Sequence, residues 1–578
     1  MLSLSFCRFP DESGLTLRTE PRDRMTKLFL RNPTPRPVKA GELTIATSAI
    51  PYPADRTHVY GEGASKLSQY EGTLTRFHSI TRYSDTRHYK LPRPDDCFVC
   101  SNLVILSPEG GRHELLGFVS CRRFHGRFYL TPSELKIILN CEGIEVPPGG
   151  EVELEHLFHG EHDDREMLLS DFASSIAVFH PRLKYEGAVT GWCSWSCYGP
   201  SVTEDDVLST LRAIQEKLPE LRFIQIDDGY QAHMGDWLDS APGYPEGVGA
   251  LCRKIKNAGF EPAIWVAPFI AEGKSTLFQT HPDWFVRDES GLPLDSSRVT
   301  FGGWRCAPWY ILDGTHPEAR NYLRTVFSVM RNEWGCRYFK LDANFWGAMP
   351  FGHRFAPQTT SVEAYRLGMA AILEGAGADS LLLGCNAPMW PSLGTCHAMR
   401  ISDDVARTPQ QFRAVARECF YHNWQHNRLW INDPDCILLL NLSSEVPDPA
   451  GQMVKRTTNL SQDAFAFHRA HILASGGMVL SGDKITEMPP ETLAILRKVL
   501  QGARASARFV GNDFSYAIRQ EGERTLHFYF NWNEYGEQEF LLPDPERRRT
   551  DYWTGIPLPQ GQRILTVPAF SASVIVEE

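Results

Sequence analysis

Two patterns of apolar and polar positions divide the chain. Up to about residue 180, short alternating segments such as "GELTIATSAI" and "ELLGFVSCRRFHGRFYL" are broken by Pro, Gly and Asp, as in antiparallel strands with one buried face. This texture predicts a β-sandwich. From about residue 185, apolar runs of strand length alternate with longer segments of helical periodicity, which is typical of βα units around a parallel sheet.

Eight strand-like runs occur in this second part. They span 188–195, 221–228, 261–268, 337–343, 380–387, 398–404, 428–433 and 476–483. Helical patterns between them cover 204–217, 245–258, 317–333, 362–377, 409–424 and 461–474, and the link from the fifth run to the sixth, "PMWPSLGTCH", is too short for a helix. Eight such units favour a (β/α)8 barrel, with a doubly wound open sheet as the alternative.

Alternation of apolar and polar residues returns after about residue 505, in "RTLHFYFNW" and "RILTVPAFSASVIVEE". We therefore predict an α/β chain in three parts. An N-terminal antiparallel β-sandwich covers 1–182, a (β/α)8 TIM barrel covers 183–503, and a small C-terminal antiparallel β-sheet domain covers 504–578.

Composition and charge narrow the function. The net charge is −11 with both signs mixed along the chain, so no basic surface for a nucleic acid is expected. There is neither an apolar run of about 18 residues nor an export signal, which argues against a membrane partner. The fourteen cysteines are scattered, as reduced core cysteines are. We expect a cytoplasmic protein, with a homo-oligomer as an open option.

The sequence predicts no metal and no cofactor. Cys97 and Cys100 form a lone CxxC without a second ligand pair. The ends of the eight runs carry no histidine, the usual ligand of zinc and related metals. The turns after the seventh and eighth runs lack the glycines of a phosphate site.

Carboxylates and tryptophans dominate the ends of the eight runs, where a barrel places its active site. In chain order these ends supply Trp192, Trp195, Asp227, Asp228, Trp265, Lys340, Asp342, Cys385, Asn386, Arg400, Asp403, Asp404, Asp433 and Asp483. Sugars stack their C–H faces on indole rings and bind carboxylates through their hydroxyls. Cleaving a glycosidic bond takes two carboxyl groups, so the pattern indicates a glycosidase.

The first candidate carboxylate stands in "YFKLDANFWG", residues 338–347. Alternation along the strand places Lys340 and Asp342 on one face. A lysine beside a carboxylate favours its ionised form, which suits a nucleophile. An ion pair that only fills the barrel is the alternative.

The second candidate stands in "MRISDDVA", residues 399–406. Alternation puts Arg400 and Asp404 on one face, while Asp403 faces the other way or starts the loop. We expect Asp404 to be the acid/base, with its pKa raised by burial and by a neighbouring negative charge. In the alternative, Asp403 and Asp404 cap the helix that follows.

Asp227 and Asp228, in "QIDDGYQAHMGDW", form a third acidic group. Two carboxylates that end one strand could bind two hydroxyls of one sugar. The alternative is a loop cap that they share with Asp236.

Together, "GWCSW", "FIQIDDGYQAHMGDW", "IWVAPF", "YFKLDANFWGA", "LGCNAP", "MRISDDVA" and "RLWINDPDC" resemble the α-galactosidases of glycoside hydrolase family 36, over about 188–440. The resemblance implies a retaining, exo-acting α-galactosidase with the three-part architecture given above. It implies Asp342 as nucleophile and Asp404 as acid/base. It also implies that Asp227 and Asp228 bind galactose O4 and O6. Trp192, Trp265, Lys340, Cys385 and Arg400 would line the subsite.

One departure from the family concerns the sandwich. Family members bring an aromatic residue, often tryptophan, from the sandwich over the sugar, but residues 1–180 contain no tryptophan. Tyr60 or Tyr70 is the expected substitute. Three alternatives to the α-galactosidase remain: an α-N-acetylgalactosaminidase, a galactosyl-transferring relative, and a carbohydrate-binding barrel without activity.

Overall fold

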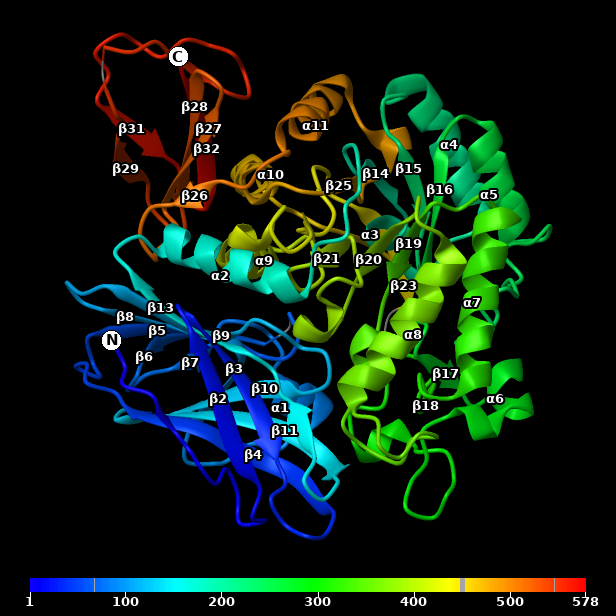
Figure 1. Cartoon of the computed structure of the whole chain (residues 1–578). Coiled ribbons are helices and arrows are strands. Elements are labelled where there is room, and N and C mark those ends of the chain that lie inside the picture. The colour runs from blue at the N-terminus through cyan, green and yellow to red at the C-terminus, as the bar shows by residue number, and fades with distance from the viewer. Residues whose placement is uncertain (67, 448–452, 545) are drawn as a thin grey trace.

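The computed structural model describes residues 1–66, 68–447, 453–544 and 546–578. Figure 1 shows the N-terminal sheet in blue and cyan beside the barrel in green and yellow, with the C-terminal strands in orange and red at the other end of the barrel. Within the described ranges, every helix is too short or too polar to cross a membrane.

The N-terminal part is antiparallel β structure, as predicted. Thirteen strands of the described chain form one hydrogen-bonded sheet. They are β1 Ser5–Phe6, β2 Thr16–Arg22, β3 Met25–Arg31, β4 Val38–Ala49, β5 Thr57–Glu62, β6 Gln69–Thr73, β7 His78–Ser79, β8 Phe98–Pro108, β9 His113–Phe118, β10 His125–Leu130, β11 Glu134–Val146, β12 Glu151–Glu153 and β13 Leu157–His162. Strand β8 links the two halves of the sheet, because it pairs first with β10 and then with β9 and β5.

The barrel contains eight parallel strands in the described chain, one in each predicted run. They are β14 Thr190–Cys193, β15 Phe223–Ile226, β16 Glu261–Val266, β19 Tyr338–Leu341, β20 Leu381–Gly384, β21 Ala398–Arg400, β22 Ile431–Asp433 and β25 Val479–Ser481. The ends of this sheet meet, since Met478 N donates to Asn432 O at 2.9 Å. The predicted (β/α)8 barrel is confirmed, and the open-sheet alternative is wrong.

Helices follow the barrel strands as the periodicity predicted. They are α4 Glu204–Lys217, α5 Val248–Asn257, α7 Pro317–Asn332, α8 Ser361–Ala376, α9 Pro409–His422 and α10 Gln462–Ser475, and α11 Pro490–Gly502 follows β25. Thr203 and Asp206 form a reciprocal capping box at the start of α4, which satisfies N–H groups that have no partner inside the helix. The link from β20 to β21 holds only the short η5, Trp390–Ser392, among its elements.

The sandwich packs against the barrel through α2, Arg165–Phe179, which contacts β9 and β13 (Figure 1). Phe172 on α2 stacks on Trp390 with ring centroids 6.2 Å apart. The Trp390 indole N–H donates to Phe118 O at 2.6 Å. These contacts place the sandwich beside the segment that follows the carboxyl end of β20.

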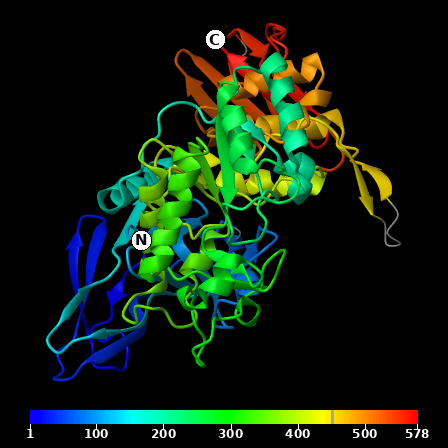
Figure 2. The same cartoon turned by 90° about the vertical axis from the view of Figure 1, so that its right-hand side faces the viewer.

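The C-terminal strands form a five-stranded antiparallel sheet and a two-stranded ribbon. They are β26 Arg508–Phe509, β27 Tyr516–Glu521, β28 Arg524–Asn531, β29 Gln538–Leu541, β30 Arg549–Asp551, β31 Ile564–Val567 and β32 Ser571–Glu577. A further hairpin, β23 Ser443–Pro447 with β24 Met453–Thr457, extends away from the barrel in Figure 2.

All fourteen cysteines are free thiols in the structure. Cys252, Cys336 and Cys419 are fully buried, as the apolar surroundings of these residues predicted.

Candidate active site

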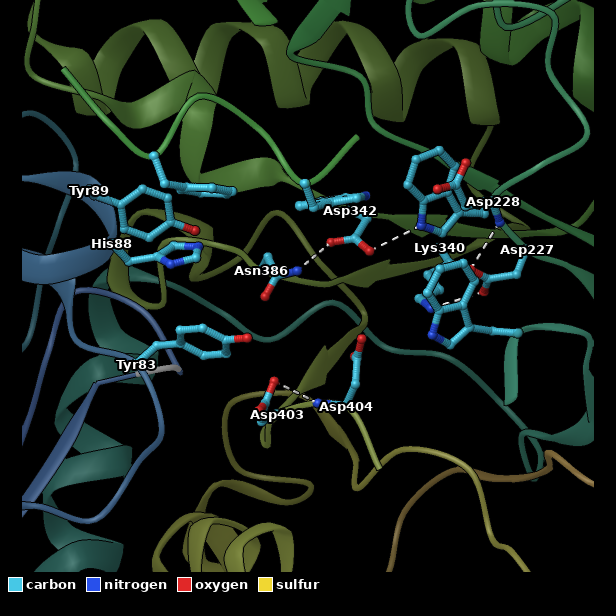
Figure 3. Close-up of a pocket in the computed structure, with 14 residues that line it drawn as sticks. Tyr83, His88, Tyr89, Asp227, Asp228, Lys340, Asp342, Asn386, Asp403 and Asp404 are labelled. Atoms are coloured by element: carbon cyan, nitrogen blue, oxygen red, sulfur yellow. Dashed lines mark hydrogen bonds and ion pairs between the residues drawn. The ribbon is translucent and has the colours of Figure 1, made fainter. Parts of the chain in front are cut away.

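A cavity of about 510 Å³ opens at the carboxyl ends of the barrel strands. Residues of the barrel and of the sandwich border it, as Figure 3 shows. They are Tyr83, His88, Tyr89, Trp195, Asp227, Asp228, Trp265, Phe301, Trp304, Lys340, Asp342, Asn386, Asp403 and Asp404. Six of the nine predicted site residues therefore meet at one cavity.

Asp342 directly follows β19 and is held by three hydrogen bonds. Its Oδ2 accepts from Trp265 Nε1 at 3.0 Å, and its Oδ1 accepts from Asn386 Nδ2 at 2.8 Å and from Ala343 N at 2.7 Å. Ala343 (φ 51°) and Asn386 (φ 42°) both have left-handed backbone. Non-glycine residues keep such a conformation where the surrounding structure fixes it, often at functional sites. The carboxylate is thus fixed in direction before any ligand binds.

Lys340 pairs with Asp227, which corrects the expectation that it acts on Asp342. Its Nζ lies 2.9 Å from Asp227 Oδ2, and both side chains are buried. Burial disfavours the charged ammonium, but Asp227 outweighs this and the pKa of Lys340 lies well above its usual value. The same Asp227 oxygen accepts from Gln225 Nε2 at 2.6 Å, so the direction of this carboxyl group is fixed.

Asp228 is paired with Arg305, a residue that the sequence did not single out. Asp228 Oδ2 accepts from Arg305 Nε at 2.9 Å, and Oδ1 accepts from Arg305 Nη2 and from Gln231 Nε2, the latter at 2.7 Å. The hydrogen bonds to Asp228 raise the pKa of Arg305. Asp236 instead accepts from the backbone N–H groups of Thr276 and Leu277, so the alternative of a shared loop cap is wrong.

Asp404 faces Asp342 across the cavity (Figure 3). Arg400 Nη1 donates to Asp404 Oδ1 at 3.1 Å, in agreement with the predicted shared face. Asp403 lies in the loop after β21 and also borders the cavity, so of its two expected places the start of the loop is right and the opposite face is wrong. The N-cap of α9 is Thr408, so the alternative that Asp403 and Asp404 cap this helix is wrong.

The pKa of Asp404 lies below its usual value, whereas the sequence led us to expect a raised one. Burial raises this pKa, but the positive charges of Lys66, Arg400 and Lys340 lower it by more. The side chain is half exposed, because one side of it faces the open cavity. The local field therefore favours the carboxylate form of Asp404.

Three of the predicted lining residues lie behind the cavity wall. Trp192 on β14 is fully buried, and its indole N–H donates to Asp483 O at 3.0 Å. Cys385 is buried beside Asp342, and burial with this negative charge raises the pKa of its thiol to about 12. Arg400 is buried and directs its guanidinium to Asp433 and Asp435 as well as Asp404. These side chains support the residues that border the cavity.

The aromatic residues from the sandwich are Tyr83, His88 and Tyr89, in and beside the short helix α1, Asp85–Tyr89. Tyr89 stacks on Phe345 with ring centroids 4.2 Å apart. Sequence reasoning missed them because it followed strand patterns. The signal was present in "TRYSDTRHYK", an aromatic and histidine-rich stretch without strand alternation.

Neither Tyr60 nor Tyr70, the expected substitutes, borders the cavity. Tyr60 is buried and stacks on Tyr421 with centroids 4.2 Å apart. Tyr70 packs beside Phe77. The sandwich does bring aromatic residues to the cavity, as expected, but these are Tyr83, His88 and Tyr89 and not Tyr60 or Tyr70.

Phe301, Trp304 and Arg305 come from the long link between β16 and β19, which also contains β17 Ile270–Glu272 and β18 Trp309–Ile311. The Phe301 ring lies 3.8 Å from the His88 ring, centroid to centroid. Most βα loops have about 2 to 6 residues. The unusual length of this link was the available signal that it carries part of the site.

A family model described as "Melibiase" matches residues 205–379. The α-galactosidase of Escherichia coli is 32% identical over 130 residues, which cover 21% of this chain and 17% of that protein. The myogenesis-regulating glycosidase of Mus musculus is 28% identical over 154 residues, which cover 26% of this chain and 20% of that protein. The matched segments thus span about a fifth of the length of these curated relatives. These matches confirm the resemblance that the motifs indicated.

The solved structure of the α-galactosidase TtGalA from Thermus thermophilus, in complex with p-nitrophenyl α-D-galactopyranoside, has the same fold. It superimposes with a TM-score of 0.66 at 22% identity, over 89% of this chain and 97% of that chain.

Proposed function

We propose that this protein is a retaining, exo-acting α-galactosidase, because residues 205–379 match the melibiase family model. It releases terminal α-linked galactose from oligosaccharides or glycosides. One observation carries the proposal: the carboxylates of Asp342 and Asp404 face the same cavity from opposite sides, and Asp227 and Asp228 border that cavity too (Figure 3).

In this proposal Asp227 and Asp228 select the sugar. The axial O4 distinguishes galactose from glucose. A buried carboxylate pair that loses its hydroxyl partner disfavours the wrong epimer. Asp228 uses three acceptor positions on Arg305 and Gln231, and a carboxylate has about four, so one remains for a sugar hydroxyl.

The reaction is a double displacement. Asp342 attacks the anomeric carbon, the bond to the leaving oxygen breaks, and Asp404 gives its proton to that oxygen. Asp404 then takes a proton from water, which attacks the same carbon, breaks the ester to Asp342 and releases galactose in the α configuration. A sugar in the cavity removes water from around Asp404, which raises its pKa toward that of a proton donor. Retention requires the two carboxyl groups to lie about 5 to 5.5 Å apart.

Paired substitutions test these roles. Asp342→Gly should abolish turnover of an aryl α-galactoside, and added azide should restore it with β-galactosyl azide as the product. Asp404→Gly should slow hydrolysis by about 10²- to 10⁴-fold and give α-galactosyl azide from a substrate with a good leaving group. The anomeric configuration of each azide is read by NMR.

Asp403→Asn is the matched control, because Asp403 is the adjacent carboxylate on the same cavity. It should give no azide product. An α-azide from an Asp403 variant, with Asp404→Gly still active, would move the acid/base role to Asp403. A faster initial rate on the aryl α-glucoside or α-N-acetylgalactosaminide than on the α-galactoside would contradict the proposed substrate.

A further inference from the structure

The peptide group between Ser402 and Asp403 is held at both ends by buried polar side chains. Its carbonyl oxygen accepts a hydrogen bond from Lys66 Nζ. Its N–H donates to Glu418 Oε2 at 2.6 Å. Lys66 is 1% exposed and Glu418 is fully buried. This peptide directly precedes Asp403 and stands one residue before Asp404, so its orientation helps to set the direction in which the Asp404 side chain leaves the barrel.

Lys66 reaches the peptide from the sandwich, on the turn between β5 and β6. Asp85 fixes this turn by accepting hydrogen bonds from Ala64 N at 2.5 Å and from Ser65 Oγ at 2.9 Å. The turn is docked on the barrel, since Met389 N donates to Ala64 O at 2.9 Å. The lysine is thus presented to the peptide by two fixed segments.

Glu418 reaches the same peptide from α9, on the barrel. Burial, together with the negative charge of Asp403, raises its pKa to about 8 although the bond from Asp403 N lowers it. Its other oxygen, Oε1, has no hydrogen-bond partner among the residues that the structure describes. An apolar side chain would be easier to bury here. The hydrogen bond that Glu418 accepts from Asp403 N therefore accounts for a carboxyl group at this position.

We propose that Lys66 and Glu418 are positioning residues for the acid/base Asp404, and that Lys66 also supplies a positive charge that this carboxyl group experiences. The inference rests on the proposed function, which makes Asp404 the proton donor. In a trans peptide the C=O and N–H groups point in opposite directions. A cation at the oxygen and a carboxyl oxygen at the N–H therefore fix the peptide plane from two sides. The sandwich thereby contributes to the proton-transfer step through a lysine that does not itself border the cavity.

The charges around Asp404 single out Lys66. The titratable groups that face it are Lys66 from the sandwich, Tyr83 before α1, Lys340 on β19, Asp342 across the cavity, Arg400 on β21, its neighbour Asp403, Glu418 on α9 and Asp435 after β22. Lys340 is paired with Asp227, and Arg400 with Asp433 and Asp435. In the described part of the chain, Lys66 forms no ion pair within 4.0 Å, so its charge acts on the cavity as a whole.

The test compares two substrates with different needs for a proton donor. Phenyl α-galactoside requires protonation of its leaving oxygen, and α-galactosyl fluoride requires little. Lys66→Met should lower kcat/KM for the phenyl glycoside by about 10- to 100-fold with little change for the fluoride. In the pH profile of the wild type, kcat/KM for the phenyl glycoside should fall on the alkaline side as Asp404 loses its proton. In Lys66→Met the positive charge is lost, so this alkaline fall in kcat/KM should shift to higher pH by about half a pH unit to one unit.

Four further variants separate the parts of the contact. Lys66→Arg keeps the charge and the hydrogen bond, and should retain the substrate ratio and the pH limb. Lys66→Gln keeps a neutral hydrogen-bond donor. It should therefore restore the wild-type ratio of kcat/KM for the phenyl glycoside to kcat/KM for the fluoride, but the alkaline fall should stay at higher pH. Glu418→Gln keeps the acceptor for Asp403 N and should behave as wild type, whereas Glu418→Met should lower the ratio as Lys66→Met does. An equal loss on both substrates in Lys66→Met, or an unmoved pH limb, would overturn the proposal.

Hydrogen exchange provides a readout that needs no activity. The amide of Asp403 should exchange faster in Lys66→Met and Glu418→Met than in wild type, with unchanged melting temperatures as the folding control. An unchanged exchange rate of the Asp403 amide in both variants would overturn the proposal that Lys66 and Glu418 hold this peptide group. A wild-type protein that cleaves neither galactoside would refute the proposed function. The exchange result would still decide whether Lys66 and Glu418 hold the peptide group between Ser402 and Asp403.

Discussion

At the scale of single residues, neighbours decide what each carboxylate in the cavity can do. Asp342, Asp227 and Asp228 all end barrel strands, yet they receive different donors: an indole and an amide, an ammonium, and a guanidinium. A bidentate guanidinium fixes the plane of a carboxylate more firmly than an ammonium does. Asp228 therefore depends on Arg305 for its direction.

Arg305→Leu tests this dependence. We expect kcat/KM for an aryl α-galactoside to fall about 10- to 100-fold, since a hydrogen bond to a charged group contributes about 1.5 to 3 kcal/mol. Arg305→Lys should recover only part of the loss. Arg298→Leu is the matched control: Arg298 lies nearby in the chain, pairs with Asp288 at 2.7 Å and is 61% exposed, so little change is expected. Equal kinetics in Arg305→Leu and wild type would remove Arg305 from the site.

At the scale of elements, α10 is buried on all sides, between α9, α11 and the C-terminal strands β28 and β32. It carries two fully buried histidines. Burial lowers the pKa of His468 to about 3 and holds that of His471 well below its usual value. Neither ring nitrogen of His471 has a hydrogen-bond partner among the described residues.

These histidines make the stability of the fold sensitive to acid. The folded chain keeps them neutral, whereas the unfolded chain protonates them near pH 6.5. Stability from this source is complete above that pH and falls below it, by up to about 1.4 kcal/mol per pH unit for each histidine. His471→Leu should reduce the difference in unfolding free energy between about pH 7.5 and about pH 5.5 by about 1.4 kcal/mol. Urea titrations at both pH values measure it.

The control for His471 is His353→Leu, because His353 is 61% exposed and should leave the pH dependence unchanged. At the higher pH, His471→Leu should cost little, since it removes a buried polar group without partners. A pH dependence equal to that of wild type would contradict the role given to His471.

At the scale of the whole molecule, the sandwich and the barrel share one cavity and a buried interface. Trp390 donates to Phe118 O, Lys66 donates to Ser402 O, and Arg123 pairs with Glu363 at 2.7 Å. Separating the two parts would expose these groups and the apolar residues beside them. We therefore expect the sandwich and the barrel to unfold together.

Two probes report on the two parts separately. Every tryptophan lies at or beyond residue 192, so tryptophan fluorescence follows the barrel and the C-terminal sheet. Cys100, Cys121 and Cys141 are buried free thiols of the sandwich, and pulse alkylation read by peptide mass follows their exposure. Their urea midpoints should coincide with that of fluorescence. Sandwich thiols that become reactive at clearly lower urea would show that the sandwich unfolds alone.

The sequence by itself determined the barrel and most of its acidic residues. Apolar runs of strand length and helical periodicity located all eight strands and the helices between them, because each strand is buried on both faces and most of the helices on one. Strand ends then located Asp227, Asp228, Trp265, Lys340, Asp342 and Asp404, since parallel strands bring their carboxyl ends to one edge.

Only the tertiary structure decided which side chains pair and which segments complete the cavity. Lys340 pairs with Asp227, Arg305 with Asp228 and Lys66 with the Ser402 carbonyl, and these partners are far apart in the chain. The aromatic residues of α1 and of the link before β18 reach the cavity through packing between the sandwich and the barrel. The charges that lower the pKa of Asp404 likewise come from three separate elements. Local patterns record the burial of each segment, but pair distances and electric fields depend on how the segments pack together.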